Sequence, residues 1–489
     1  MTLKTRLPNA SPAPRWLQKI QYTRNSFAYM DAAAQHNGDI FNAPVIGNHD
    51  VVLFISNPQA LGRIFTSDTK QFIAPPNQLT QPIVGDESIF TLVGSRHRRE
   101  RKLLMPPFHR ERMQAYGQLI CERVDKSMSS LSIGTQFSAR ELAQDISLEV
   151  ILTVVFGVER GERFDRLKSL IVRFTDSLQS PLIGGLLFFP SLQKDWGTRS
   201  PWGYLRHLQR QISELVYAEI RDRRNQNHVQ GSDILSLLIC VRDETGTPMT
   251  DAQLHDELIT LLLAGQETTA SAIAWALYAI HRHPEVGKKL LVELNQMGKS
   301  PEPTTIAQQP YLTAVCNETL RLFPVAVITV PREVKEPVEL MGYQLEPGMR
   351  LYGCIYLTHQ RSDLYPEPKL FNPERFLERQ FSPYEFLPFG GGARRCIGEA
   401  LASFEMKLVL ATMLSRYRLA MADRFPEYPQ RRGVTFAPAR GVQMVLEEKL
   451  PSRVEFSTLM LVRPKLHIVT PLPVLLDVKA HDFDRIFKS

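Results

Sequence analysis

The stretch FLPFGGGARRCIGEA, residues 386–400, places one cysteine, Cys396, directly after a glycine-rich and basic loop. A thiolate is a metal ligand or a nucleophile, and N–H donors or a helix N-terminus stabilise it. The following residues, IGEALASFEMKLVLATML, have the pattern of an amphipathic helix, so the helix dipole should favour negative charge at Cys396. Glycines let the backbone approach a flat object closely, and Arg394 offers a bidentate donor to a carboxylate. These features fit a haem whose iron binds Cys396 and whose propionate binds Arg394.

Two other functions of this loop remain open from its residues alone. A glycine-rich loop could bind phosphate, but this one lacks the lysine and the serine or threonine of a P-loop and also lacks GxGxxG spacing. Cys396 could instead be a catalytic nucleophile, which would require a nearby histidine base. Neither alternative accounts for the second unusual segment, AGQETT.

Residues 264–269, AGQETT, break the rules of a buried helix in the middle of the longest helical pattern, residues 251–283. Gly265 costs about 1 kcal/mol relative to alanine in a helix interior. Glu267 puts an acid into an apolar run, and Thr268 can bond back to the carbonyl four residues earlier. Three such departures together indicate a functional site. The alternative is a water-filled packing defect or a helix with one wet face.

A third candidate lies in YLTAVCNETLRLFP, where Glu318 and Arg321 are three residues apart on one helix face. From spacing alone, an exposed helix ion pair worth a few tenths of a kcal/mol is the better interpretation.

Taken together, these segments resemble the cytochrome P450 family. Phe389, Gly392, Arg394, Cys396 and Gly398 have the spacing of its haem-binding signature, which fixes five residues within ten positions. AGQETT resembles the oxygen-binding groove of the family's long central helix, and ETLR resembles its ExxR helix. The similarity extends from about residue 36 to about residue 448, and it reverses the interpretation of the ETLR pair.

The resemblance also assigns residues outside these segments. Arg375, in FNPERF, is expected to close a network with Glu318 and Arg321. RHRRERKLLMPPFH resembles the helix that usually carries WxxxR, with His97 in the tryptophan position and Arg101 after it. Four side chains are then expected to neutralise the two haem propionates: His97, Arg101, Arg332 and Arg394.

By resemblance, haem b lies between the Cys396 loop and the AGQETT helix, with Cys396 as the axial thiolate. Ala264 and Gly265 should line the haem, and Gly265 should leave room for dioxygen. Thr268 should hold or deliver protons, and Glu267 should connect that relay to solvent. The implied reaction inserts one oxygen atom of O2 into a C–H bond and reduces the other to water.

Two alternatives to this monooxygenase remain: a peroxygenase that uses hydrogen peroxide and the same haem, and a non-catalytic haem carrier or sensor. Electrons for the monooxygenase should come from an external ferredoxin or flavodoxin with an NAD(P)H reductase, because no GxGxxG follows a strand. A basic run in residues 96–102 could dock such an acidic partner, although a solvated helix face is an equal alternative. The run comprises Arg96, Arg98, Arg99, Arg101 and Lys102.

The substrate pocket is expected to be apolar and its ligand lipophilic. A fatty acid is the first choice, with a terpenoid or steroid next. FFPSLQKDWGTRSPWGYL and GVTFAPARGVQMV resemble a bacterial, soluble and cyanobacterial branch that oxidises such lipids. The expected pocket walls are Pro82, Ile83, Val84, Phe90, Leu261, Ala264, Val325, Val327, Ile328 and Phe436.

The elements that must position these residues are mostly helices. Residues 251–283 should form a central helix of roughly 50 Å, capped by Thr250 with Gln253 completing a capping box. Further helices are expected over residues 58–67, 94–126 with a break at two prolines, and 203–226. Strands are expected over 47–56, 327–334, 338–345 and 349–360. This pattern predicts a mainly α (α+β) fold, which the resemblance sharpens to the helix-rich triangular prism of the P450s with small β-sheets.

The 489 residues carry a net charge of +7 and five widely spaced cysteines with no CxxC pair. A disulfide framework and a structural zinc site are therefore not expected. No stretch reaches the roughly 20 apolar residues of a membrane span, so we expect a soluble cytoplasmic protein, with peripheral membrane contact left open. Interspersed acids argue against nucleic-acid binding. Residues 1–450 should form the haem domain, and residues 451–489 should be a C-terminal extension whose role the sequence does not reveal.

Overall fold

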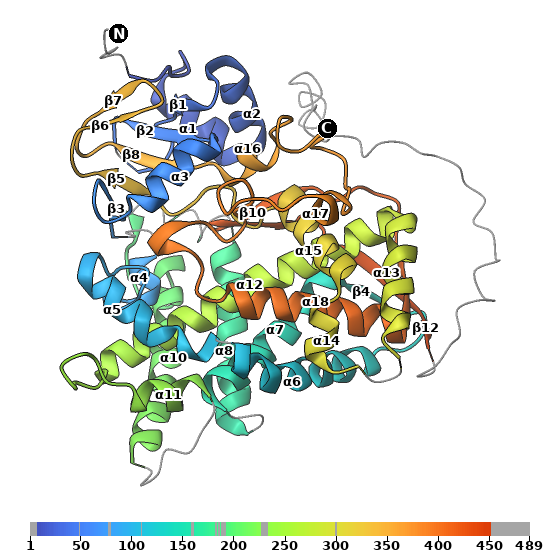
Figure 1. The fold of residues 1–489 in the computed structure, drawn as a ribbon. Coiled ribbons are helices and arrows are strands. Elements are labelled where there is room, and N and C mark those ends of the chain that lie inside the picture. Colours follow the sequence, from blue (N-terminus) through green and yellow to red (C-terminus); the bar gives the residue numbers. More distant parts are fainter. Residues whose placement is uncertain are drawn as a thin grey trace.

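The computed structural model describes residues 7–450, except residues 48, 77–79, 109, 158–160, 181–182, 184–185, 187–191, 226–232 and 299–300. The predicted C-terminal extension, residues 451–489, lies outside the described residues. Figure 1 shows two regions: a large helical body, and a smaller region at one end where the main sheet lies with α1, α2, α3 and α16.

Helix α12 (Asp251–Arg282) crosses the helical body, as predicted (Figure 1). Its start is fixed by the capping box of Thr250 and Gln253. The half from Thr269 to Ile280 is buried. Over its whole length, α12 has its most extensive helix–helix contacts with four helices of the body. These neighbours are α7 (Ala139–Phe156), α10 (Pro201–Arg224), α15 (Pro310–Leu322) and α18 (Glu399–Arg416).

The other helices surround this centre or cover the sheet. They are α1 (Arg15–Arg24), α2 (Ser26–Asn37), α3 (Pro58–Thr66), α4 (Gln81–Val84), α5 (Gly94–Leu104), α6 (Arg110–Ser129), α8 (Glu162–Gln179), α11 (Ile234–Cys240), α13 (Pro284–Gln296), α14 (Pro303–Ala307), α16 (Ile355–His359) and α17 (Arg375–Glu378), with 3-10 turns at Pro106–Phe108 and Gly392–Arg394. The break predicted in residues 94–126 is the first of these turns, which separates α5 from α6.

The largest sheet has five strands in the order β1-β2-β8-β5-β3. Strands β2 and β8 are parallel, and the other neighbouring pairs are antiparallel. Its strands are β1 (Ile40–Asn42), β2 (Val52–Ile55), β3 (Phe72–Ile73), β5 (Arg332–Val334) and β8 (Arg350–Gly353). Three smaller sheets comprise β4 (Gln136–Ser138) with β12 (Gln443–Lys449) and β9 (Tyr417–Met421), β6 (Val338–Leu340) with β7 (Tyr343–Leu345), and β10 (Pro429–Arg432) with β11 (Thr435–Pro438).

Three predicted strands were too long. Of residues 47–56, only Val52–Ile55 form a strand, β2. The segment 349–360 is a strand only as far as Gly353 and then forms α16, whose residues are all buried. A short buried apolar run does not reveal whether it is strand or helix, so the sequence pattern could not mark this change. In the segment 327–334 the strand starts only at Arg332, after Pro331, which has no N–H to donate to a ladder.

The hydrophobic core is divided in the same way as the fold. One large cluster of buried side chains fills the helical body around α12, α7 and α18. Two smaller clusters lie on the sheet side, one around α2 and one around α3. Among the described residues, no helix has both the length and the apolar content that crossing a membrane requires.

Candidate active site

Cys396 lies two residues before Gly398, the N-cap of α18, as the sequence predicted. Its backbone N–H donates to the carbonyl of Phe389 at 3.0 Å, which closes the loop. Burial raises the pKa of the Cys396 thiol, whereas the N–H groups of Gly398 and Glu399 and the charge of Arg101 act against this rise. The same donors would stabilise a metal-bound thiolate.

The loop glycines make room for neighbouring side chains of the protein. A Cβ on Gly391 would lie 2.6 Å from the ring of Phe65, and a Cβ on Gly392 would lie 2.6 Å from the Asp68 carboxylate. Gly392 also has a φ of +65°, which disfavours other residues. Close approach was predicted toward a flat ligand, but at these two positions it brings the loop against Phe65 and Asp68.

Asp68 is a site residue that sequence reasoning missed. Its carboxylate accepts from Arg332 at 2.8 and 2.9 Å and from the Ala393 N–H at 2.9 Å. The Arg332 side chain is almost fully buried and also donates to the carbonyl of Gly391. Arg332 therefore ties β5 to the Cys396 loop. An acid in the loop after α3 has no motif around it that could have marked this role.

Positive charge accumulates beside the loop. In the described part of the chain, Arg101 and Arg394 have no ion-pair partner within 4 Å. Burial, together with Arg332 and Arg101, lowers the pKa of Arg394 to about 10. Burial and the three arginines lower the pKa of His97 to about 3, so His97 is neutral. This surplus of buried positive charge fits a ligand with two carboxylates, such as the propionates of haem.

One face of α12 is open in the middle of the helix. Leu261, Ala264 and Thr268 are half-buried, whereas Leu262 and Thr269 beside them are buried. The spacing of three and four residues places the half-buried ones on one face. The Thr268 hydroxyl donates to the carbonyl of Ala264 at 2.8 Å. This is the bond to the carbonyl four residues earlier that the sequence predicted.

Gly265 has a different surrounding from the one the resemblance implied. A Cβ at this position would meet Cγ1 and Cδ1 of Ile151 on α7, both at 3.2 Å. The missing side chain therefore permits close packing of α12 against α7. The expectation that Gly265 also leaves room for dioxygen stays a prediction.

Glu267 lies close to a cation rather than open to solvent. Nη1 of Arg140, at the start of α7, lies 3.1 and 3.2 Å from the two carboxylate oxygens of Glu267. Both side chains are nearly buried, with exposed fractions of 8% for Arg140 and 12% for Glu267. Burial raises the pKa of Glu267, while Arg140 and Arg432 lower it and Asp176 raises it. Arg140 was not singled out from the sequence, because it lies 127 residues away.

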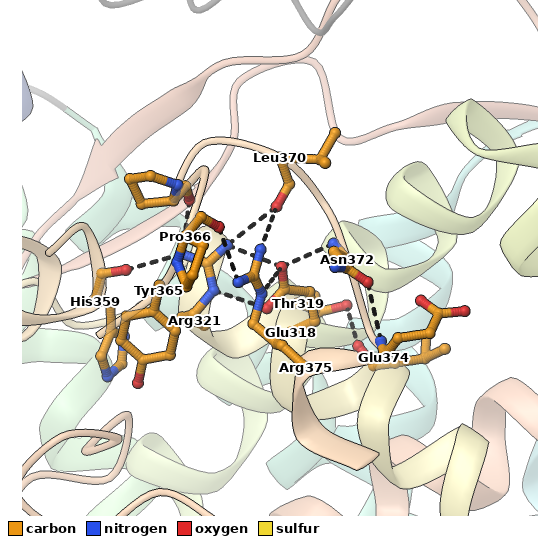
Figure 2. Close-up of polar contacts among 12 residues, drawn as sticks. Glu318, Thr319, Arg321, His359, Tyr365, Pro366, Leu370, Asn372, Glu374 and Arg375 are labelled. Atoms are coloured by element: carbon orange, nitrogen blue, oxygen red, sulfur yellow. Dashed lines mark hydrogen bonds and ion pairs between the residues drawn. The ribbon is translucent and has the colours of Figure 1, made fainter. Parts of the chain in front are cut away.

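Glu318, Arg321 and Arg375 meet in one buried network, shown in Figure 2. The Glu318 carboxylate accepts from Arg321 at 2.7 and 2.8 Å and from Arg375 at 3.1 Å. The Asn372 N–H adds a fourth donor at 2.8 Å. Arg321 also donates to three backbone carbonyls, those of His359, Pro368 and Leu370. The network thus fastens α15 to the chain that leads into the Cys396 loop.

Comparison with known proteins identifies the assembly of these parts. Residues 7–442 match the family model described as Cytochrome P450. The chain belongs to the cytochrome P450 family. It is therefore an oxidoreductase of the monooxygenase type. Membership of this family implies a haem whose iron has a cysteine thiolate ligand. Among the described residues, Cys396 has the surroundings that this ligand requires.

The relatives are bacterial P450s. "Putative cytochrome P450 135B1" of Mycobacterium tuberculosis is 33% identical over 438 residues, which cover 88% of this chain and 90% of the relative. "Putative cytochrome P450 138" of the same species is 31% identical over 449 residues, covering 91% and 97%. The solved structure "Retinoic acid bound cyanobacterial CYP120A1" superposes with a TM-score of 0.81 at 23% identity and covers 91% of this chain and all of that one. This structural likeness shows the P450 fold.

The residues expected to line the substrate pocket differ in their burial. Phe90 and Leu261 are partly exposed and remain candidates for the pocket of this P450. Val327 and Phe436 are buried in the core cluster around α2. The Phe436 ring packs edge-on against Phe27 at a centroid distance of 4.9 Å. Their assignment as substrate contacts stays a prediction, which these core contacts do not favour, because alternation along a short extended segment can send such side chains into the core.

The burial of the other expected pocket residues does not show whether they face a substrate. Ile328 is partly buried and packs against the same cluster as Val327. Val325 is partly buried against the helical core, and Ile83 and Val84 are buried there. These positions stay predictions.

The basic run on α5 is largely neutralised. Arg96 pairs with Glu87, Arg99 with Asp243 at 3.3 Å, and Lys102 with Glu244 at 3.2 Å. Arg101 is half-buried beside the Cys396 loop. Arg98 is exposed. The run therefore presents less net positive charge to a partner than its sequence suggested.

Proposed function

We propose that this P450 uses dioxygen and an external ferredoxin or flavodoxin, with its NAD(P)H reductase, to hydroxylate a lipophilic substrate. The observation that carries the proposal is the open face of α12, where half-buried Leu261 and Ala264 adjoin the Thr268 hydroxyl. A fatty acid is the favoured substrate, with a terpenoid or steroid next. The structural neighbour CYP120A1 has retinoic acid bound, and this lipophilic carboxylic acid supports the same substrate class here.

Haem, when bound, supplies the oxidation of an unactivated C–H bond. Cys396 would hold its iron, with the N–H groups of Gly398 and Glu399 beside the sulfur. Arg101 and Arg394 would hold the propionates, since both are cations without an ion-pair partner within 4 Å among the described residues. Arg332 acts more indirectly, because its guanidinium is already bonded to Asp68. Neutral His97 can donate one N–H to the same carboxylates.

The residues of α12 supply the protons. The Thr268 hydroxyl donates a hydrogen bond to the Ala264 carbonyl. Both residues lie on the half-buried face of α12, where a substrate and dioxygen would meet. Glu267, one residue earlier, retains a small exposed fraction and can exchange protons with solvent when it separates from Arg140. An intact acid and alcohol at these positions favour dioxygen over hydrogen peroxide as the oxidant, because delivered protons matter most for dioxygen.

The test uses the purified, haem-loaded full chain. Binding difference spectra are recorded with a fatty acid, a terpene and a steroid, and the best binder is then turned over with ferredoxin and reductase or with hydrogen peroxide alone. We expect a spectral shift with the fatty acid, product with the electron chain and loss of the thiolate-type carbon monoxide spectrum in Cys396→Ala. Turnover by peroxide alone would make the protein a peroxygenase, and binding without any oxygenated product would make it a carrier or sensor. A cytoplasmic location stays a prediction.

A further inference from the structure

A chain of hydrogen bonds outside the haem site joins a serine, a histidine and an aspartate. Nε2 of His255 lies 2.9 Å from Oγ of Ser213, and Nδ1 of the same ring lies 2.8 Å from Oδ1 of Asp256. Ser213 is on α10, and the other two residues are in the first turns of α12. The order of atoms is that of a nucleophile, a general base and an orienting acid.

The protein holds the acid and the base in place. The second oxygen of Asp256 accepts the backbone N–H of Glu87 at 2.9 Å. Gly85, with a φ of +89°, lies so close that a Cβ there would be 2.1 Å from that oxygen, so only glycine fits. The imidazole of His255 stacks on Tyr217 with centroids 4.3 Å apart and an angle of 4° between the planes. These contacts orient the ring independently of Ser213.

The donors and acceptors fix the direction of proton transfer. A carboxylate only accepts hydrogen bonds, so Nδ1 of His255 carries the proton that is donated to Asp256. In the tautomer that carries its proton on Nδ1, Nε2 holds a lone pair that can accept the Ser213 hydroxyl, whose oxygen lies 2.9 Å away. His255 is thereby positioned to take the proton of Ser213 when Oγ attacks an electrophile.

Ser213 borders a shallow and largely open surface depression of about 350 Å³ on α10, called the cleft below. The cleft is lined by Arg210, Ser213, Glu214, Tyr217 and Arg221. Backbone N–H groups in the interior of α10 are used by the helix itself, so they cannot form an oxyanion hole here. Arg210 and Arg221 place two cations at the cleft and Glu214 places one carboxylate there, so the lining carries a net positive charge that favours a substrate with negative charge.

We propose that Ser213, His255 and Asp256 form a second, hydrolytic site that cleaves small esters bearing an anionic group. Ser213 Oγ attacks the carbonyl carbon while its proton passes to His255 Nε2. The tetrahedral intermediate collapses, the C–O bond to the alcohol breaks, and His255 returns the proton to the leaving alcohol. Water, deprotonated by His255, then cleaves the acyl–serine ester and restores the Ser213 hydroxyl.

The test follows hydrolysis of two matched acetate esters by the haem-loaded full chain. 4-Acetoxy-3-nitrobenzoate carries a carboxylate, and 2-nitrophenyl acetate is its neutral counterpart. We expect faster hydrolysis of the anionic ester, and a loss of at least about 100-fold in the protein-dependent rate in Ser213→Ala and in His255→Gln, the range of general-base catalysis. Arg221→Gln should raise KM for the anionic ester and leave KM for the neutral one unchanged.

Labelling identifies the nucleophile. An alkyl fluorophosphonate should modify Ser213, detected by mass spectrometry of the peptide, and the His255→Gln variant should not be labelled. The control variant is Ser177→Ala on α8, whose hydroxyl donates to the carbonyl of Arg173 and which should keep full ester hydrolysis. An unchanged carbon monoxide spectrum of the haem shows that each variant is folded. Unlabelled Ser213 in the native protein, or hydrolysis that Ser213→Ala leaves intact, would overturn the proposal and leave these residues a structural link between α10 and α12.

Discussion

Glu318 on α15 and Glu257 on α12 are both completely buried, but their surroundings are opposite. Glu318 accepts four hydrogen bonds, three of them from the guanidinium groups of Arg321 and Arg375. Neither carboxyl oxygen of Glu257 has a hydrogen-bond partner among the described residues. Burial and the nearby Glu100 raise the pKa of Glu257 well above its usual value. The backbone N–H of Ile89 lies close enough to oppose this rise in part, but its geometry is not that of a hydrogen bond.

The contrast separates two ways of keeping an acid in a protein interior. The donors around Glu318 replace the water that its carboxylate lost on burial, and they join α15 to the segment around Arg375. In the described part of the chain, Glu257 has no hydrogen-bond donors of this kind, so burial favours its neutral form and raises its pKa. Glu267 lies between these limits, since it has Arg140 as a partner but keeps a raised pKa. We therefore expect the paired carboxylate of Glu318 to fix the position of α15. We expect the raised pKa values of Glu257 and Glu267 to make the packing of α12 depend on pH.

The largest effect is expected at the saturated network. Glu318→Gln removes the charge that Arg321 and Arg375 share, and it should lower the free energy of unfolding by about 3–5 kcal/mol and reduce haem content. Denaturant unfolding and haem absorbance measure both. Glu385→Gln is the control, because its partner Arg379 has a side chain that is 45% exposed and the loss should stay near or below about 1 kcal/mol. Equal losses in the two variants would remove the contrast.

Breaking the Glu267–Arg140 pair should give a smaller loss of unfolding free energy, and this loss should depend on pH. Arg140→Gln withdraws a cation from Glu267 and should cost about 1–3 kcal/mol of unfolding free energy at pH 7. The variant should raise the pKa of Glu267 in the folded protein further above its value in the unfolded chain. At pH values above the unfolded-chain pKa, the folded state then binds more protons than the unfolded state, so the free energy of unfolding falls as pH rises. The difference between variant and native protein should therefore shrink on going from pH 7 to pH 5. Oxygen use per product should rise in the same variant.

A loss in Arg140→Gln that is the same at both pH values would show that Arg140 acts by packing alone. In contrast to Arg140→Gln, Thr268→Ala should raise oxygen use per product without a pH-dependent change in stability, because Thr268 carries no charge.

Removing the unpaired acid should have the opposite sign. Glu257→Gln deletes a group whose raised pKa makes the folded state less stable as pH rises above the unfolded pKa, so it should stabilise the protein by about 1–3 kcal/mol at pH 8 and change little at pH 4. Thermal unfolding at the two pH values measures this. Glu244→Gln, with a side chain that is 82% exposed, is the neutral comparison. A destabilised Glu257→Gln at pH 8 would mean that the carboxyl group is ionised and paired.

The smallest effect is expected at the packing glycine of α12. Gly265→Ala gains up to about 1 kcal/mol of helix propensity, but its Cβ would lie 3.2 Å from Ile151. The two terms should nearly cancel, within about 1 kcal/mol. In an Ile151→Val background, which lacks Cδ1, the same substitution should be more favourable, and a double-mutant cycle measures the coupling. Strict additivity would show that Ile151 does not limit this position.

Local signals predicted the parts of the site that are continuous in the chain. The capping box at Thr250, the helix after Cys396 and the Thr268 hydroxyl bond all depend on neighbours within four residues. Partners from distant segments were out of reach. Asp68 lies 264 residues from Arg332, and Arg140 lies 127 residues from Glu267. No periodicity relates such pairs, so only the packed structure brings them together.

The resemblance to a family predicted more than the residues did, but it did not determine side-chain direction. It placed Glu318, Arg321 and Arg375 in one network, which the contacts bear out. It did not fix which way Phe436 points, and that ring lies in the core around α2. A shift of one position along an extended segment moves a side chain from one face to the other, so alternation without a known register cannot assign a pocket wall.

By itself, the sequence determined that this chain is a helix-rich P450 with α12 as its central helix, and it predicted Cys396 as the thiolate ligand, because spacing along the chain encodes both motifs and helices. Only the tertiary structure decided how charges are shared: Arg332 with Asp68, Glu267 with Arg140, and Glu257 with no partner among the described residues. The physical reason is that an interior charge depends on which donors the fold brings within about 3 Å, and hydrogen bonds and Coulomb forces follow distance in space rather than order along the chain.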